Sequence, residues 1–268
     1  MTIKERVSFP TTTPEETMPL VIDFFKQYQA DLQGLGLAHL GLSISIAIPP
    51  LMGTLPRPRI GMANFDFIGT MKKEFPIPIS WTTDVNAAAY GEYVFGSGKG
   101  LSSVVYYTIG TGVGGGALQE GRFIEGFSHP EMGHMLVVPH PKDDFAGSCP
   151  FHGNCLEGMA AGPAIEKRLG KKGQEVAEDD PYWEIEASYI AQCAYNTTLM
   201  FSPDVIIFGG GVMKQRHMLQ NVHDAFAKLV NGYVETPELS KYIVTPALED
   251  NAGTLGCLAL AREAVLHS

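Results

Sequence analysis

Two cysteines and two histidines lie at spacings that suit a metal ion. Cys149, His152 and Cys155 follow one another at intervals of three residues, and His134 lies upstream of them. Zinc in structural sites takes four sulfur or nitrogen ligands in a tetrahedron that protein atoms close completely. The pattern therefore predicts a structural zinc site held by these four side chains.

Other assignments of these residues stay open. His129 and His140 are alternative fourth ligands, and two free thiols beside two surface histidines would need no metal at all. A zinc hydrolase requires an open coordination position, so a closed set of four disfavours that class of enzyme. Cys193 and Cys257 lie in apolar helical stretches and are interpreted as small buried hydrophobes.

A run of glycines, Gly110-Thr-Gly-Val-Gly-Gly-Gly116, lies between two apolar stretches. Glycines let the backbone approach an anion closely, and successive amides form an anion-binding nest to which Thr111 would add a hydroxyl. No Gly-Lys-Ser/Thr follows, so the run is not a Walker loop, and the expected next element is a strand rather than the helix of a dinucleotide fold. Taken alone, the run is more often a flexible hairpin turn.

A second glycine cluster, Gly209-Gly-Gly211, ends a buried apolar strand and precedes a helix. Open α/β sheets commonly bind nucleotides at such a place, although tight packing of helix on strand explains the cluster equally well. Two glycine turns at strand ends together favour a nucleotide between them.

Three carboxylates lie where catalysis could use them. Glu131 comes three residues before His134, and Glu157 two after Cys155, so a metal would hold both near one another. Asp84 starts a helix that follows an apolar strand. It is either a helix N-cap or a general base that the helix N-terminus keeps ionised.

The apolar pattern predicts strands that alternate with helices, which is typical of the α/β class. Strands are expected at 7–9, 40–48, 77–81, 104–109, 117–118, 204–208 and 242–244. Helices are expected after the capping signal at Thr13, at 71–75, 84–95, 156–169 and 183–200, from Gly211 to about Val230, and at 252–266.

Composition narrows the partners. The chain has 268 residues, 45% of them apolar and 18% charged, with a formal net charge of −10. A negative surface repels nucleic acid and anionic membranes, so neither is expected as a partner. No run approaches the roughly 18–20 apolar residues of a membrane span, and no apolar segment follows the first charges. We expect a cytoplasmic protein.

The motifs, in their order along the chain, resemble the repressor–ORF–kinase (ROK) family of sugar kinases over residues 64 to 266. The matching segments are Thr83-Asp84-Val85-Asn86-Ala87-Ala88, Gly110 to Gly116, Glu131-Met132-Gly133-His134, Cys149 to Glu157, Ala161-Gly162-Pro163-Ala164 and Phe208-Gly209-Gly210-Gly211-Val212. The Thr-Thr-Asp-Val-Asn and Cys-x-x-His-x-x-Cys variants resemble the fructokinase branch more than the glucokinase branch.

The resemblance implies an actin-like ATPase (ribonuclease H-like) fold of two lobes, with ATP and sugar in the cleft between them. The N-terminal lobe would span 1–95, with the final helix at 252–266 packed back on it. The C-terminal lobe would span 96–251 and carry the zinc site and the nucleotide glycines.

On the sugar side, the resemblance assigns Asp84 as the catalytic base that takes the proton of the sugar hydroxyl, with Asn86 beside it. Glu131, His134 and Glu157 would bind sugar hydroxyls. His134 would place one ring nitrogen on zinc and the other toward the sugar.

On the nucleotide side, the resemblance assigns Thr111 and Gly112 to the ATP phosphates, which Mg²⁺ would bridge. The residues expected to flank the nucleoside are Pro163, Gly210, Gly211, Val212, Met213 and Lys214.

Two features depart from the family pattern. Family members begin with a β-hairpin that carries Asp-x-Gly-Gly-Thr, the first phosphate loop, whereas Val7-Ser8-Phe9 resembles the strand that follows this hairpin. The N-terminal lobe is therefore expected to lack its first hairpin. Residues 43–62 also depart, and the match resumes abruptly at Ala63, which is the trace that two compensating frameshifts would leave.

These patterns predict ATP-dependent phosphorylation of a hexose, D-fructose to fructose 6-phosphate. The alternative is a non-catalytic or vestigial sugar-binding protein of the same fold, since the first phosphate loop is missing. The family resemblance also allows a homodimer.

Overall fold

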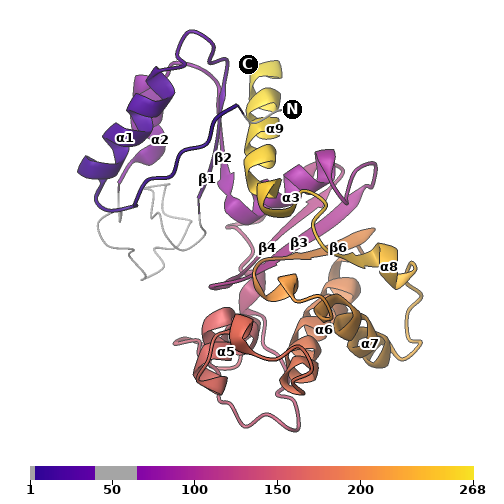
Figure 1. Cartoon of the computed structure of the whole chain (residues 1–268). Helices are drawn as coiled ribbons and strands as arrows, with labels where there is room; N and C mark the ends of the chain where they lie inside the picture. The colour runs from indigo at the N-terminus through magenta and orange to yellow at the C-terminus, as the bar shows by residue number, and fades with distance from the viewer. Residues whose placement is uncertain (1–3, 40–64) are drawn as a thin grey trace.

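The structure is a computed structural model that describes residues 4–39 and 65–268 (Figure 1). The strand expected at 40–48 and the departure at 43–62 lie outside the described residues. Over the described part the chain is α/β, with a small sheet near the N-terminus and a larger one after it. None of the described helices is both long and apolar enough to span a membrane.

The small sheet pairs β1 (Leu35–His39) with β2 (Ile79–Thr83) in parallel. Helices α1 (Pro14–Lys26) and α2 (Phe67–Glu74) bury apolar side chains against it. The core of this unit is formed by Met18, Leu35, Met71 and Phe75.

The strand predicted at 7–9 is wrong. Val7 is 42% exposed, and no strand forms over these residues. An extended segment becomes a strand only where a neighbour takes up its backbone hydrogen bonds, and the pairing of the small sheet within the described residues is confined to β1 and β2.

The larger sheet has the strand order β5-β4-β3-β6-β7. Its central strand β3 runs antiparallel to β4 and parallel to β6. The strands are β3 (Ser103–Ile109), β4 (Val113–Gln119), β5 (Arg122–Phe123), β6 (Val205–Gly209) and β7 (Ile243–Val244).

Helices cover both faces of this sheet because the side chains of β3 alternate. Val105 and Tyr107 pack in one core cluster with residues of α6 (Tyr182–Phe201) and α7 (Met218–Val230). On the other face, Val104 and Tyr106 pack in a second cluster with two helices, α3 (Asp84–Phe95) and α9 (Ala252–Leu266). These helices contribute Ala88, Ala89 and Ala252.

The single helix predicted at 156–169 is wrong, because the chain breaks at Ala161 into α4 (Leu156–Ala160) and α5 (Gly162–Leu169). Ala161 is extended, with ψ 155°. Pro163 has no amide proton and its ring clashes with the carbonyl four residues earlier, so it suits the first turn of a new helix and not the middle of an old one. The remaining short elements are η1 (Met132–His134), η2 (Gly173–Glu175), η3 (Val212–Lys214), α8 (Leu239–Tyr242) and η4 (Glu249–Asn251).

Helices α3 and α9 touch backbone to backbone. A Cβ atom at Gly256 would lie 1.7 Å from the carbonyl oxygen of Ala87, and one at Gly91 would lie 2.2 Å from that of Ala252. A Cβ at Gly36 in β1 would lie 1.8 Å from the carbonyl oxygen of Cys257. Glycine at these places therefore lets α9 lie against both α3 and the small sheet, as Figure 1 shows.

This close contact makes Gly256 sensitive to a single methyl group. We expect Gly256→Ala to lower the free energy of unfolding by about 1–3 kcal/mol, as overpacking does. Gly253→Ala in the same helix is the matched control, because its Cβ would meet only the Asp84 carbonyl oxygen at 3.9 Å, and loss of a helical glycine gains about 0.5–1 kcal/mol. Urea unfolding followed by circular dichroism measures both, and equal midpoints for the two variants would contradict the contact.

Candidate active site

Asp84 lies at the start of α3, immediately after β2 ends at Thr83. The hydroxyl of Thr83 accepts a hydrogen bond from the backbone amide of Asn86 at 3.2 Å. Thr83 is therefore the N-cap, and the interpretation of Asp84 as the cap is wrong. Asp84 occupies the first turn, where the helix dipole favours an ionised carboxylate.

The N-terminus of α3 reaches the site because β4 is built from glycine. A Cβ at Gly114 would lie 2.8 Å from a methyl carbon of Val85, and one at Gly116 would lie 2.8 Å from the side-chain oxygen of Asn86. A Cβ at Gly115 would lie 2.9 Å from the Cβ of Met132 in η1. The absence of side chains at these three positions therefore allows α3 and η1 to pack directly on β4.

The expectation of one glycine turn from Gly110 to Gly116 is corrected accordingly. The turn is Gly110 to Gly112, and β4 begins at Val113. Gly114, Gly115 and Gly116 pair with Thr108, Tyr107 and Tyr106 of β3. Sequence reasoning missed this because glycine is a poor strand former on its own and the close approach of α3 and η1 is a tertiary contact.

The two glycine turns lie side by side. Because β3 and β6 are paired in parallel, with Thr108 opposite Gly209, their carboxyl ends meet at one edge of the sheet. A Cβ at Gly110 would lie 3.9 Å from the backbone nitrogen of Gly211. The left-handed φ of +92° at Gly210, where a Cβ would lie 2.3 Å from the carbonyl oxygen of Ile109, requires glycine at that position.

The start of α5 joins this edge. The amide of Gly162 donates to the carbonyl of Gly110 at 2.7 Å, which puts the neighbouring Pro163 at the rim. Lys214, at the end of η3, forms an exposed ion pair with Asp250 at 2.9 Å. The residues predicted for the phosphates and the nucleoside therefore gather around one edge of the larger sheet.

The carboxylates predicted to bind sugar are also brought together. Desolvation and, after it, the negative charge of Glu157 raise the pKa of Glu131. Glu157 lies in the first turn of α4, and its Oε2 accepts a hydrogen bond from the amide of Val113 at 3.1 Å. Asn86 is 2% exposed and donates through its amide group to Glu125 at 3.2 Å. Glu125 was not predicted, because neither its residue type nor its spacing sets it apart in the sequence.

The four predicted zinc ligands form a cluster in space. One ligand atom from each of His134, Cys149, His152 and Cys155 lies within 4.8 Å of all the others. The Nδ1 atom of His134 lies 3.4 Å from Cys155 Sγ and 3.9 Å from Cys149 Sγ, and His152 Nδ1 lies 3.6 Å from Cys149 Sγ. The edges of a tetrahedral zinc site with such ligands measure about 3.3–3.8 Å.

The chemistry of these donors also fits a cation. Burial raises the pKa of Cys155 to about 11, so its thiolate needs a positive charge beside it. Cys155 also caps α4, because its sulfur accepts a hydrogen bond from the Gly158 amide at 3.4 Å. The side chains present therefore suit a zinc ion and link its site to α4.

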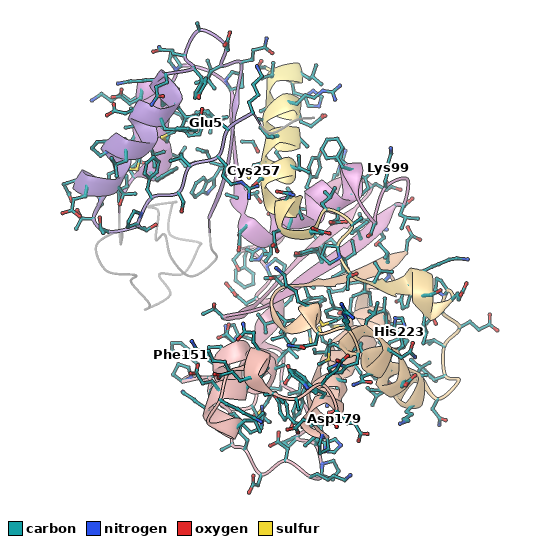
Figure 2. All side chains as sticks on the ribbon, viewed as in Figure 1. Glu5, Lys99, Phe151, Asp179, His223 and Cys257 are labelled. Carbon is teal, nitrogen blue, oxygen red and sulfur yellow. The ribbon has the colours of Figure 1, made fainter. Side chains whose placement is uncertain are left out.

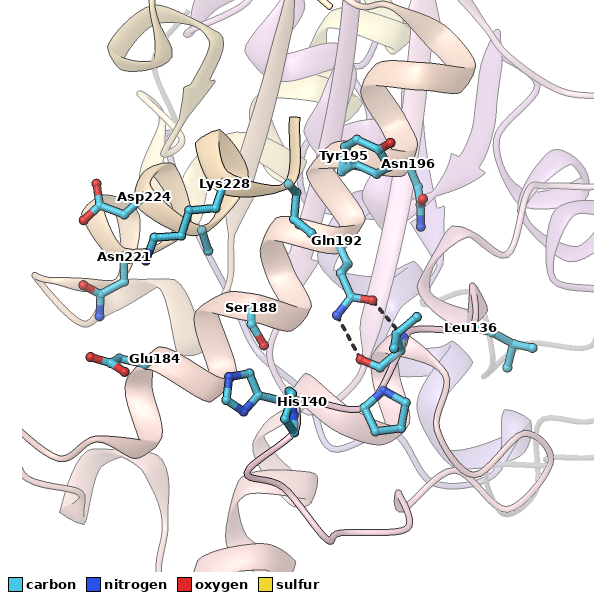
Figure 3. A pocket seen from close by; sticks show the side chains of 15 residues that line it. Leu136, His140, Glu184, Ser188, Gln192, Tyr195, Asn196, Asn221, Asp224 and Lys228 are labelled. Atoms are coloured by element: carbon cyan, nitrogen blue, oxygen red, sulfur yellow. Dashed lines mark hydrogen bonds between the residues drawn. The ribbon is translucent and has the colours of Figure 1, made fainter. Parts of the chain in front are cut away.

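A separate cavity of about 770 Å³ lies between residues 136–141 and helices α6 and α7 (Figure 3). Gln192 holds Val138 at its wall through two hydrogen bonds, of 2.7 and 3.0 Å. His140 also lines this cavity, and its Nδ1 accepts from the Lys142 amide at 3.2 Å, so it is outside the cysteine cluster. The described lining contains none of the residues predicted for sugar or nucleotide.

Fold and site together define an α/β protein with the actin-like ATPase fold, as predicted. The ROK family profile matches residues 1–264, and the chain belongs to the ROK family.

Relatives agree with this assignment. The chain is 46% identical over 266 residues to a fructokinase of Streptococcus mutans, covering 97% of this chain and 90% of the relative. A ROK hexokinase from Thermus thermophilus superimposes with a TM-score of 0.78 at 22% identity, covering 98% of this chain and 91% of that one. A ROK glucokinase from Streptomyces griseus in complex with glucose and AMPPNP superimposes with a TM-score of 0.68 at 23% identity, covering 94% and 89%.

The metal assignment predicts the behaviour of the cysteines. We expect Cys149→Ser to reduce the zinc content from about one ion per chain, measured by plasma mass spectrometry, and to lower the melting temperature. Cys257→Ser is the matched control, because Cys257 lies in α9, well apart from the loop that carries Phe151 (Figure 2). Full zinc content in the Cys149 variant would show that the metal assignment is wrong.

Proposed function

We propose that this protein is a fructokinase that transfers the γ-phosphoryl group of ATP to D-fructose, giving fructose 6-phosphate. The observation that carries the proposal is the meeting of three parts at β4: the N-terminus of α3 with Asp84, the turn of Gly110 to Gly112, and the carboxylate of Glu157. The identity of 46% to a relative named fructokinase, against 22–23% to the hexokinase and glucokinase structures, supports fructose as the sugar.

Asp84 acts as the general base. Its carboxylate takes the proton from the 6-hydroxyl of the sugar while that oxygen attacks the γ-phosphorus, and the bond from this phosphorus to the bridging oxygen of ADP breaks. The first turn of α3 keeps the carboxylate ionised before the reaction. Asn86, Glu131, His134 and Glu157 bind sugar hydroxyls and aim the attacking oxygen.

The nucleotide occupies the edge where the two glycine turns meet. Thr111 and Gly112 donate to the phosphates, which approach the exposed side of the turn. The residues that flank the nucleoside are Pro163, Gly210, Gly211, Val212, Met213 and Lys214. Mg²⁺, when bound with ATP, neutralises charge on the phosphates.

Zinc has a structural role in this proposal. His134, Cys149, His152 and Cys155 would hold it, and Nδ1 of His134 lies toward the sulfurs. Coordination at this ring nitrogen would fix the tautomer of the imidazole and leave Nε2 to meet the sugar.

The cleft for both substrates lies between two lobes, which we place at 1–95 with 252–266 and at 96–251. Helix α3 belongs to the first by sequence but also packs on the larger sheet, so it forms the floor between them. A cytoplasmic location and a homodimer complete the proposal, and light scattering on a sizing column tests the latter.

Turnover and binding are to be measured side by side. We expect phosphorylation of fructose in a coupled assay with Mg-ATP, at a kcat/KM above that for glucose or mannose, and fructose binding by calorimetry. Fructose binding without turnover would identify the non-catalytic sugar-binding alternative. Turnover with another hexose in preference to fructose would overturn the substrate assignment but leave the kinase assignment in place.

The base assignment makes a sharper prediction. We expect Asp84→Asn to lower kcat by about 10²–10⁴-fold, the usual contribution of a positioned general base, with zinc content and fructose affinity retained. Asp179→Asn is the matched control, because Asp179 is exposed in the segment between α5 and α6. A kcat of the Asp84 variant near that of the wild type would remove Asp84 from the mechanism.

A further inference from the structure

Both backbone polar groups of Val113 face the part of the site that is proposed to bind sugar. Its amide donates to Oε2 of Glu157 at 3.1 Å. Its carbonyl oxygen lies so close to Gly133 that a Cβ there would be 1.8 Å away. Val113 is 7% exposed, whereas Thr111, two residues earlier at the tip of the turn, is exposed.

The Glu157 carboxylate also lies directly beside Gly112. A Cβ at Gly112 would lie 2.7 Å from Oε2 of Glu157. Gly112 therefore serves the close approach of a protein carboxylate from one side, in addition to the approach of phosphate from the other.

A second bond fixes the other end of the turn. The Gly162 amide donates to the Gly110 carbonyl at 2.7 Å. Glu157 and Gly162 lie in consecutive short helices, so one segment of the chain holds both the first and the last peptide of the turn. The start of that segment is itself fixed by the Cys155 sulfur on the Gly158 amide.

We propose that Glu157 is a positioning residue for the nucleotide: through its hydrogen bond to the Val113 amide it holds the phosphate turn in its binding shape before any sugar is present. The inference deepens the proposed function and rests on it for the identity of the nucleotide. Since Val113 is buried, its amide requires an acceptor from the protein, and the phosphates meet the exposed part of the turn instead. Glu157 thereby links the sugar side of the site to the nucleotide side.

The test measures nucleotide affinity without sugar, which a role in sugar binding alone would not change. We expect Glu157→Ala to raise the Kd of Mg-AMPPNP, measured by calorimetry on sugar-free protein, by about tenfold, the scale of a lost hydrogen bond to a charged acceptor. Glu157→Gln keeps a side-chain oxygen that can accept from Val113, so we expect it to restore most of the affinity.

Glu131→Ala is the matched control. Glu131 is the neighbouring carboxylate of the same site, but the hydrogen bond to the turn comes from Glu157. We expect this variant to weaken fructose binding and to raise the sugar-free Kd of Mg-AMPPNP clearly less than Glu157→Ala does, because it leaves the hydrogen bond from Val113 to Glu157 in place.

A second measurement distinguishes a local change in the turn from general unfolding of the Glu157→Ala variant. Hydrogen–deuterium exchange of the peptide that spans residues 110–116 should be faster in Glu157→Ala than in Glu131→Ala, with equal zinc content and equal exchange in α6. Unchanged or tighter nucleotide binding in Glu157→Ala overturns the inference, as does an equal loss in Glu131→Ala. An inactive wild-type enzyme that still shows this pattern of affinities would refute the proposed function and not the role of Glu157.

Discussion

The run of three glycines in β4, from Gly114 to Gly116, is the constraint on which the rest of the site depends. Two elements, α3 and η1, meet at this strand, and each approaches it more closely than a Cβ would permit at Gly114, Gly115 or Gly116. Strand glycines normally weaken a sheet, so their cost here is offset by the pairing with β3 and by the burial of α3. The start of α3 with Asp84, the segment η1 and the turn of Gly110 to Gly112 are therefore located by one short stretch of backbone.

Local signals in the sequence predicted the parts of this arrangement that short segments determine. Helices α3 and α9 have the predicted bounds, 84–95 and 252–266, and both segments are rich in alanine, the residue with the highest helix propensity. The clustering of the histidine and cysteine side chains was also predictable, because residues three apart in a tight loop can turn toward one point. The position of Asp84 after an apolar strand was sufficient to place it at a helix start.

The parts that could not be predicted depend on contacts between distant segments. The residues around Gly114 do not indicate that Val85 packs on it, so the first part of β4 was predicted to be a turn. Pro163 marks the break at Ala161 locally, but the hydrogen bond that positions the start of α5 runs from Gly162 to Gly110, more than fifty residues away. The hydrogen bond from Val113 to Glu157 likewise joins residues that are far apart in the sequence. Thr83 and Asp84 are both good cap residues, and only the backbone dihedral angles show that Thr83 is extended and therefore the cap.

The position of α9 bears on how the chain is made. The small sheet packs against α9, which is synthesised only after all strands of the larger sheet. The two ends of the colour scale in Figure 1 lie side by side for this reason. At about 5–20 residues per second, the interval between the end of β2 and the start of α9 is roughly 10–30 s. During that time α1 and α2 can cover β1, but the part of the strand at Gly36 that contacts Cys257 has no partner from α9. Truncation before α9 would therefore expose the part of β1 at Gly36 that contacts Cys257.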